Sequence, residues 1–114
     1  MADCIFCEIV QGNMQADIVF RDDELVAFRD INPQAPTHIL VIPTRHIDTL
    51  NDLEPRDEPL IGKLVSRARA LAQEEGIAER GYRLVMNCNR EAGQTVFHIH
   101  VHLLGGRAMG WPPG

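Results

Sequence analysis

Three histidines alternate with apolar residues along the stretch 96–104, which is followed by a glycine pair at 105–106. Successive side chains of a β-strand point to opposite faces, so a strand here would place His98, His100 and His102 in one row, roughly 6.6 Å apart. The opposite face would be uniformly apolar, and it would be formed by Phe97, Ile99, Val101 and Leu103. Three imidazoles carry six ring nitrogens that need partners. The pattern therefore favours a functional site over a core strand.

Two kinds of chemistry can be built on this row. Imidazoles at alternate strand positions can hold a catalytic zinc ion that activates water. Alternatively, one neutral imidazole can attack an electrophile and form a covalent intermediate, since the ordinary histidine pKa of about 6.5 leaves the ring available at pH 7. Phosphorus is the expected electrophile, because the preceding loop Gly93-Gln94-Thr95 and further histidines could hold phosphate oxygens.

A CxxC pair, Cys4 and Cys7, opens the chain with the spacing of a metal knuckle. One pair supplies half of a tetrahedral site, so a redox pair or two buried thiols are the alternative interpretations. His46 and His98 would complete a closed Cys₂His₂ site of the structural kind, and His100 would remain free to act as a nucleophile. All five histidines lie within 38–46 and 98–102, which indicates that these two regions are neighbours.

The elements that must position these residues follow from the hydrophobic pattern. We expect a short N-terminal helix ended by Gly12, a hairpin of strands 18–20 and 25–28, and a buried central strand 37–43. Thr44 reads as the N-cap of a helical segment, and 57–75 as the one long helix. The apolar stripe of that helix is Leu60, Ile61, Leu64, Val65, Ala68, Leu71 and Ala72. A fourth strand over 81–87 precedes the histidine strand.

Length and composition bound the interpretation. The 114 residues predict a single domain over 1–114, and the net charge of -5 without a basic stripe argues against a nucleic-acid partner. No apolar run approaches the length of a transmembrane helix, and no secretory signal is evident, so we expect no membrane partner. Three cysteines do not form a disulfide framework, which favours a cytoplasmic location.

Four stretches, in order along the chain, resemble the histidine-triad (HIT) family and its Hint branch in particular: 30–38 (DINPQAPTH), 98–104 (HIHVHLL), 105–107 (GGR) and 111–114 (WPPG). The resemblance implies an α+β fold with a five-stranded antiparallel sheet, one long helix and a short N-terminal helix. It also implies a homodimer in which two such sheets join into one. The implied activity is that of a purine nucleoside phosphoramidase, which cleaves the P–N bond of AMP–amine conjugates.

The same resemblance implies a role for each matching residue. His100 corresponds to the nucleophile that becomes nucleotidylated, His38 to a residue that orients the triad, and Thr95 to a hydroxyl that assists the leaving amine. The α-phosphate would be contacted by His102, Asn87, Gly93 and Thr95. The ribose would be bound by Asp30, which the pattern alone leaves as a solvated strand-end carboxylate. The purine pocket would be walled by Phe6, Phe28, Ile31 and Leu40, and the zinc, of structural type, held by Cys4, Cys7, His46 and His98.

Other functions remain open at this point. A dinucleoside polyphosphate hydrolase or a nucleotidyltransferase could be built on the same triad. A metallohydrolase would lose catalysis on zinc removal, and a nucleotide-binding regulatory module would bind nucleoside monophosphates without a physiological amine substrate. The apolar tail at Trp111 predicts docking on its own sheet or on a partner subunit, where it could line the leaving-group pocket.

Overall fold

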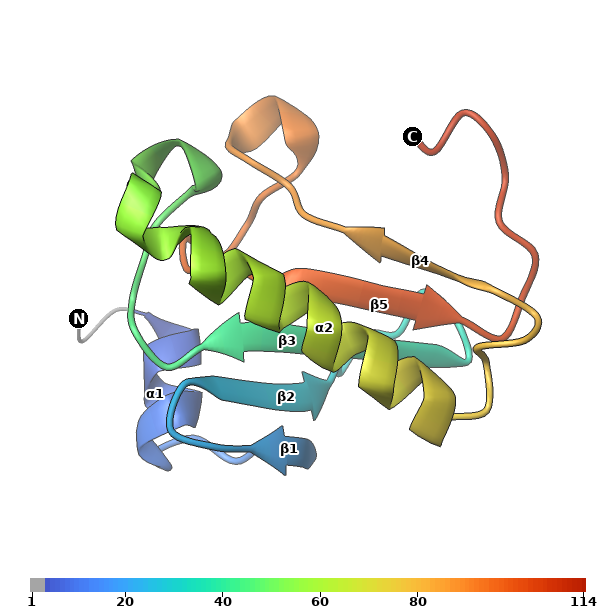
Figure 1. The fold of residues 1–114 in the computed structure, drawn as a ribbon, viewed down its shortest axis with the longest axis horizontal. Coiled ribbons are helices and arrows are strands. Elements are labelled where there is room, and N and C mark those ends of the chain that lie inside the picture. Colours follow the sequence, from blue (N-terminus) through green and yellow to red (C-terminus); the bar gives the residue numbers. More distant parts are fainter. Residues whose placement is uncertain (1–3) are drawn as a thin grey trace.

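Five antiparallel strands form one sheet in the order β1-β2-β3-β5-β4 in the computed structural model, which describes residues 4–114 (Figure 1). The strands are β1 (Ile18–Arg21), β2 (Leu25–Arg29), β3 (Thr37–Pro43), β4 (Tyr82–Val85) and β5 (Val101–Gly105). The helices are α1 (Ile5–Gln11) and α2 (Glu58–Glu74), with short 3₁₀ turns at Leu50–Asp52, Pro55–Asp57 and Arg90–Ala92. The predicted α+β architecture is confirmed.

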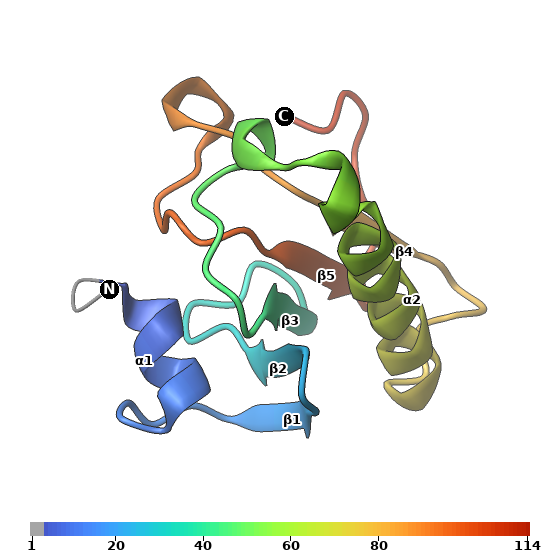
Figure 2. The ribbon, with the colours of Figure 1, turned by 60° about the vertical axis from the view of Figure 1, so that its left-hand side comes forward.

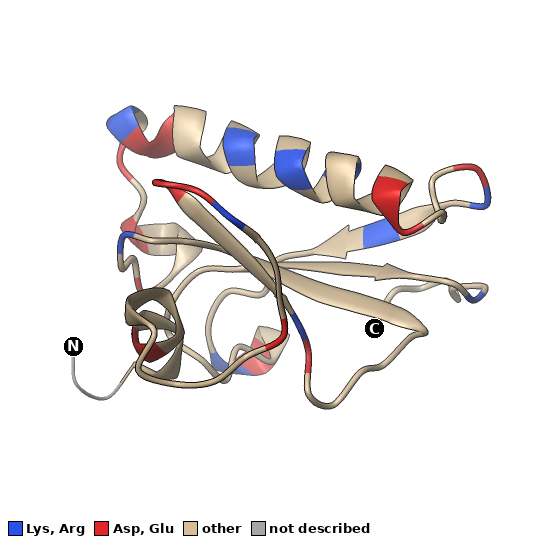
Figure 3. Cartoon of the chain, turned by 90° about the horizontal axis from the view of Figure 1, so that it is seen from below, with Lys and Arg blue, Asp and Glu red and all other residues tan. Residues whose placement is uncertain are grey.

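Helix α2 packs on one face of the sheet through residues spaced three or four apart (Figure 2). Leu64, Ala68 and Leu71 are buried against Ile39 and other strand residues of this core. Charged residues are frequent along the helix, whereas the strands carry few (Figure 3). Within residues 4–114, neither α2 nor any other helix is long and apolar enough to cross a membrane.

The predicted apolar stripe of α2 is wrong at one position. Val65 is 44% exposed, although its neighbour Leu64 is fully buried. Successive residues of an α-helix are rotated by about 100° around its axis, so a residue directly after the centre of the buried face turns away from the sheet. The other six members of the stripe are buried or packed against the core.

Helix α1 covers the opposite face of the sheet (Figure 2). The Cys4 side chain caps its first turn by accepting a hydrogen bond from the Cys7 backbone N–H, and Gly12, at a φ of 81°, ends it as predicted. Phe6 and Ile9 are buried against β2 and β3, including Leu40. The alternation along β3 thus sends Leu40 toward α1 and Ile39 toward α2, which places the site on the α1 side.

The histidine strand begins later than predicted. β5 starts at Val101, paired with Val41 of β3, and the residues 96–100 before it are irregular. Pro43 ends β3 and has no N–H to continue the ladder, while its carbonyl accepts a hydrogen bond from the His98 ring. The predicted facing nevertheless holds for the histidines, because His98 and His100 lie on the α1 side of the sheet.

The predicted N-cap at Thr44 is wrong. No helix starts there, and the next helical turn begins at Leu50. The Thr44 hydroxyl donates to the Asp23 carbonyl and its N–H donates to the Glu24 carbonyl, so both groups anchor the chain to the β1–β2 turn. The extended segment that follows is what carries His46 to the N-terminus of α1.

Candidate functional site

A cavity of about 280 Å³ lies against α1 and the ends of the central strands. It gathers eight of the residues that the sequence nominates: Phe6, Phe28, Asp30, Ile31, Leu40, Thr95, His100 and His102. Aromatic and aliphatic side chains form most of its wall, and its polar groups include the Asp30 carboxylate and the two imidazoles, with Gln15, Arg29 and Thr95 also in the lining. Such a mixture suits a ligand that has both a flat apolar part and a polar or anionic part.

The backbone decides which nitrogen of His100 carries the hydrogen. Its Nδ1 lies 2.7 Å from the His98 carbonyl oxygen, and a carbonyl can only accept, so Nδ1 is the protonated nitrogen. Burial lowers the pKa of His100, so the ring is neutral at pH 7. A neutral ring with hydrogen on Nδ1 has a bare lone pair on Nε2. His100 therefore carries an available nucleophilic nitrogen at the cavity.

His102 is set in the opposite tautomer by a chain of hydrogen bonds. The Gln34 backbone N–H donates to His38 Nδ1, which leaves the hydrogen of a neutral His38 on Nε2. That Nε2–H lies 2.9 Å from His102 Nδ1, so His102 accepts there and keeps its own hydrogen on Nε2. Burial, and then the neighbouring rings of His100 and His38, lower the pKa of His102 to about 4. His102 is thus a neutral donor next to a neutral nucleophile.

Asp30 lines the cavity beside His38. Its Oδ2 lies 3.5 Å from His38 Nε2, and its Oδ1 accepts a hydrogen bond from the Asn32 N–H. The side chain remains partly exposed where it lines the cavity, so it can also accept hydrogen bonds from a ligand. The sequence pattern alone left Asp30 as a solvated carboxylate, and its contact with the histidines corrects that interpretation.

Phe6 of α1 packs against the aromatic rings of the site. Its ring meets His100 edge to face at a centroid distance of 5.1 Å and meets Phe28 in the same manner at 5.4 Å. It also contacts the His98 ring. The position of α1 therefore controls both the wall of the cavity and the orientation of two histidines.

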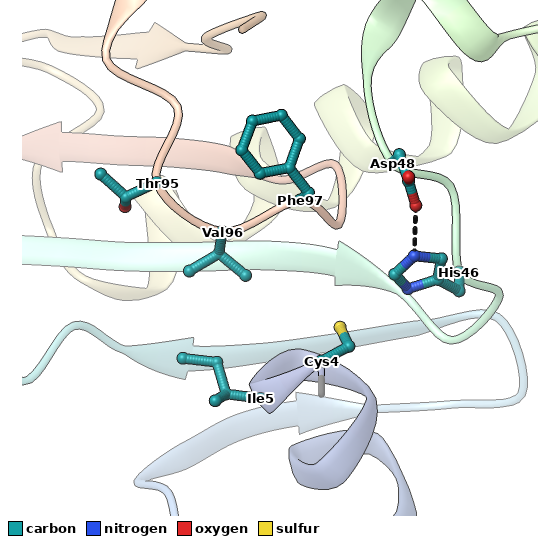
Figure 4. Close-up of a pocket in the computed structure, with 7 residues that line it drawn as sticks. All are labelled: Cys4, Ile5, His46, Asp48, Thr95, Val96 and Phe97. Carbon is teal, nitrogen blue, oxygen red and sulfur yellow. Dashed lines mark hydrogen bonds and ion pairs between the residues drawn. The ribbon is translucent and has the colours of Figure 1, made fainter. Parts of the chain in front are cut away.

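A second cluster lies beside the cavity and is formed by Cys4, Cys7, His46 and His98, whose donor atoms all lie within 4.8 Å of one another. His98 Nε2 donates to the Pro43 carbonyl and His46 Nε2 donates to the Asp48 carboxylate (Figure 4). Both rings consequently turn a bare Nδ1 toward the sulfurs, and the two Nδ1 atoms are 3.2 Å apart. Each Nδ1 also lies 3.2–3.3 Å from a cysteine sulfur, so two nitrogens and two sulfurs converge on one point, as the donor set of a bound cation does. These four residues fit a metal ion.

The ionisation of the cluster supports the same conclusion. Burial, followed by the adjacent Cys4 thiol, raises the pKa of Cys7 to about 11, and burial lowers the pKa of His98 to about 4. Without a cation, Cys7 would be a neutral thiol and His98 a neutral imidazole in a buried pocket. A metal ion stabilises thiolates and uses the imidazole lone pairs.

Five residues nominated for catalysis or substrate binding do not line the cavity: His38, which contacts His102, and Asn87, Gly93, Gln94 and Trp111. Trp111 is 83% exposed, so it does not dock on its own sheet. Gln94 is buried, and its amide group bonds to three backbone groups: it donates to the carbonyls of Asp48 and Val96 and accepts from the Asn89 N–H. Its side chain holds the 89–94 loop in place and has no free group for a phosphate.

Two residues that sequence reasoning missed support the histidines. Asp48 orients His46, and the backbone N–H of Gln34 sets the tautomer of His38. A carboxylate two residues after a candidate ligand is a signal that could have identified Asp48. No side-chain pattern could have identified Gln34, because only its main chain acts.

Comparison with known proteins points to one family. The HIT domain model matches residues 11–109. The chain is 53% identical over 108 residues to a purine nucleoside phosphoramidase of Escherichia coli K12, covering 95% of this chain and 91% of that protein. It is 49% identical over 112 residues to an uncharacterized HIT-like protein of Synechococcus elongatus, covering 98% and 97% of the two chains.

Solved structures agree with the sequence comparison. A HIT family hydrolase from Legionella pneumophila superposes with a TM-score of 0.97 at 56% identity, covering 98% of this chain and 100% of that chain. A histidine triad protein from Clostridium difficile superposes with a TM-score of 0.93 at 37% identity, covering 96% of each chain. The match in both cases extends over nearly the whole fold described above.

Proposed function

This chain belongs to the HIT domain family, and on that premise we propose that it hydrolyses the P–N bond of purine nucleoside phosphoramidates and releases AMP. The observation that carries the proposal is the tautomer of His100. Its Nδ1–H is held by the His98 carbonyl, so a bare Nε2 meets the cavity beside the donor His102. Identity of 53% to a protein named purine nucleoside phosphoramidase supports the same reaction.

The reaction proceeds in two displacements. His100 Nε2 attacks the α-phosphorus, a P–N bond to the histidine forms, and the bond to the amine breaks with its electron pair going to the amine nitrogen. That nitrogen takes a proton as it leaves, and we assign assistance of this proton transfer to the hydroxyl of Thr95, which lines the cavity. Water then attacks the nucleotidyl-histidine and AMP is released. The His102 Nε2–H donates to a phosphate oxygen and stabilises the charge that develops there.

The remaining cavity residues select the nucleoside. Asp30 accepts hydrogen bonds from the ribose hydroxyls, and the purine base lies among the aromatic and aliphatic side chains of Phe6, Phe28, Ile31 and Leu40. Asn87 and Gly93 do not line the cavity, and a contact from either residue to the phosphate stays a prediction. His38 acts through His102 and is a positioning residue.

We propose that the metal held by Cys4, Cys7, His46 and His98 is zinc and that its role is structural. Two sulfurs and two imidazole nitrogens are the ligand set of closed zinc sites, which leave no position for a water molecule. The cluster connects the first turn of α1, the segment after β3 and the start of the histidine row. A bound zinc ion would thus fix α1, and with it Phe6, against the catalytic histidines.

The assembly we propose is a homodimer. Within residues 4–114, β4 pairs only with β5 and forms one edge of the sheet. Its outer hydrogen-bonding groups are available to the same strand of a second copy, which would extend the two sheets into one. Because Cys4 and Cys7 must stay reduced to bind zinc, we place the protein in the cytoplasm.

The test is AMP release from adenosine 5′-phosphoramidate by the wild type and by His100→Ala. We expect turnover by the wild type, none by the variant, and a nucleotidyl adduct on the quenched wild type by intact mass spectrometry. No turnover by a folded wild type that binds AMP would support a binding module instead. Turnover that survives in His100→Ala would exclude the covalent mechanism and favour the metallohydrolase.

A further inference from the structure

The loop 31–36, between β2 and β3, begins the chain of hydrogen bonds that ends on His102. The Gln34 N–H donates to His38 Nδ1, and His38 Nε2 lies 2.9 Å from His102 Nδ1. Gln34 is exposed and belongs to neither strand. Exposed loops are more mobile than the strands they connect, so a backbone N–H keeps its direction there only if other contacts hold the loop. The contacts of Gln34 therefore decide the tautomers of two histidines.

Arg107 holds Gln34 from the end of β5. Its Nε donates to the Gln34 carbonyl at 3.0 Å, and its Nη1 donates to the Ala108 carbonyl, also at 3.0 Å. Among residues 4–114, Arg107 is the one side chain outside the segment 30–38 that hydrogen-bonds to the loop 31–36. Because the guanidinium is planar, two bound donors fix its orientation. Gln34 is thus held at its carbonyl by Arg107, while its N–H donates to His38.

The backbone beside Arg107 packs against the same loop. Gly106 has a φ of 91°, and a Cβ added there would lie 2.8 Å from the Pro36 ring. The chain that leaves β5 therefore runs directly along the loop. β5 also carries His102. One strand and its extension thus supply both the anchor of Gln34 and the last histidine of the hydrogen-bond chain.

Loss of this anchor would make a second pair of tautomers available. His38 would then carry its hydrogen on Nδ1 and accept on Nε2, so His102 would donate from Nδ1 and keep a bare Nε2. A bare Nε2 cannot donate to a phosphate oxygen, and the charge that develops during the reaction would lose a hydrogen bond. The position of Gln34 therefore preserves the donor that the reaction uses.

We propose that Arg107 is a positioning residue for the hydrolysis: it holds the Gln34 carbonyl, and through Gln34 and His38 it keeps the hydrogen of His102 on Nε2. The inference rests on the proposed phosphoramidase function, in which this hydrogen is donated to the phosphate. Arg107 does not line the cavity, so its replacement should act on kcat and leave KM nearly unchanged.

The direct test is NMR of the free protein at neutral pH, with the histidine rings labelled with a nitrogen isotope. A ring nitrogen that carries hydrogen and a bare one are distinct, so the spectrum reports each tautomer without any turnover. We expect His38 and His102 to be single tautomers in the wild type and mixtures in Arg107→Met, which removes the donors and keeps an apolar stem. Arg107→Lys, which can still donate one hydrogen bond to Gln34, should restore most of the wild-type spectrum.

Steady-state kinetics on adenosine 5′-phosphoramidate test the same chain of contacts. We expect Arg107→Met to lower kcat about fivefold, the worth of roughly one hydrogen bond, and to change KM by less than about twofold. Arg83→Met is the matched control, because Arg83 also donates to a backbone carbonyl, that of Gly110, at 2.9 Å and has no hydrogen bond to the loop 31–36. It should change neither kcat nor the ring spectrum.

Melting curves establish that each variant is folded, and Arg107→Ala is measured in place of Arg107→Met if the latter does not fold. Unchanged His38 and His102 spectra in the folded variant overturn the proposal and leave the proposed function intact. An equal loss of kcat in Arg83→Met also overturns it, because order in the tail would then explain the effect. No turnover by a folded wild type refutes the proposed function, and the ring spectra still decide whether Arg107 sets the tautomers.

Discussion

Replacement of Gln94 by methionine separates a positioning role from substrate contact. The Gln94 side chain makes three hydrogen bonds to backbone groups, to Asp48, Val96 and Asn89, at 2.8–3.1 Å. Each such bond contributes roughly 1 kcal/mol, so Gln94→Met should lower the free energy of unfolding by about 3 kcal/mol. For a domain of this size that corresponds to a fall in Tm of ~10 °C. Catalysis should fall mainly through kcat, because the 89–94 loop loses its anchor to the segment that carries His46.

The assay is chemical and thermal unfolding at matched metal content, together with steady-state kinetics. Gln73→Met provides the control, since Gln73 is exposed on α2 and its replacement should change stability by less than ~0.5 kcal/mol. A Gln94→Met protein with a wild-type Tm and a raised KM would refute the reasoning. It would mean that Gln94 contacts the substrate after all.

Four other predictions follow from the structure. Cys4→Ser should lower both the bound metal and the Tm while leaving detectable turnover, and a variant that keeps its melting curve and its metal would count against the site. The free energy of unfolding should decline as the pH falls from about 6.5 to about 4. The reason is that His102 binds a proton in the unfolded chain but stays neutral in the folded state, where its pKa is lowered to about 4. Urea titrations across this range should show a flatter decline for His102→Gln. Gly106→Ala should cost roughly 2 kcal/mol or more, measured by urea unfolding, because φ is 91° there and an added Cβ would lie 2.8 Å from the Pro36 ring. Deletion of residues 111–114 should alter the preference among amines if the exposed Trp111 reaches a partner's site, and unchanged selectivity across several amines would remove that idea.

The period-two pattern predicted the facing of the histidines, although the ladder does not extend to His98 and His100 and the alternation fails at Phe97. His98 and His100 precede β5 and still point toward α1, since ring-to-carbonyl bonds replace the missing strand pairing. The start of the strand could not be predicted in the same manner. It depends on Pro43, which lies two residues beyond Val41, the partner of Val101, and comes near the histidine row only after folding.

The sequence predicted some of the residues that line the cavity and misplaced others. Residue types at matching positions located His100, His102 and Asp30, which the cavity brings together. Gln94 was expected among the ligand contacts, because a glutamine between glycine and threonine looks the same in sequence whether its amide faces a ligand or the main chain. Phe97 was expected on the apolar face of a strand, and the irregular backbone before β5 exposes it instead. Both errors arise from local geometry that only the packed neighbours determine.

Backbone groups determine which ring nitrogen carries the hydrogen in three of the histidines. The Pro43 carbonyl accepts from His98, the His98 carbonyl accepts from His100, and the Gln34 N–H donates to His38. Where side chains orient a histidine, a single substitution removes the hydrogen bond. Here any side-chain replacement at Pro43 or Gln34 leaves the carbonyl or amide in place. The tautomers of His98 and His38 are therefore insensitive to mutation at those positions and sensitive to local opening of the backbone. Opening of the chain at Pro43 would also free the ring of His98, a ligand of the proposed zinc ion. Activity and local order in this protein should consequently be lost together.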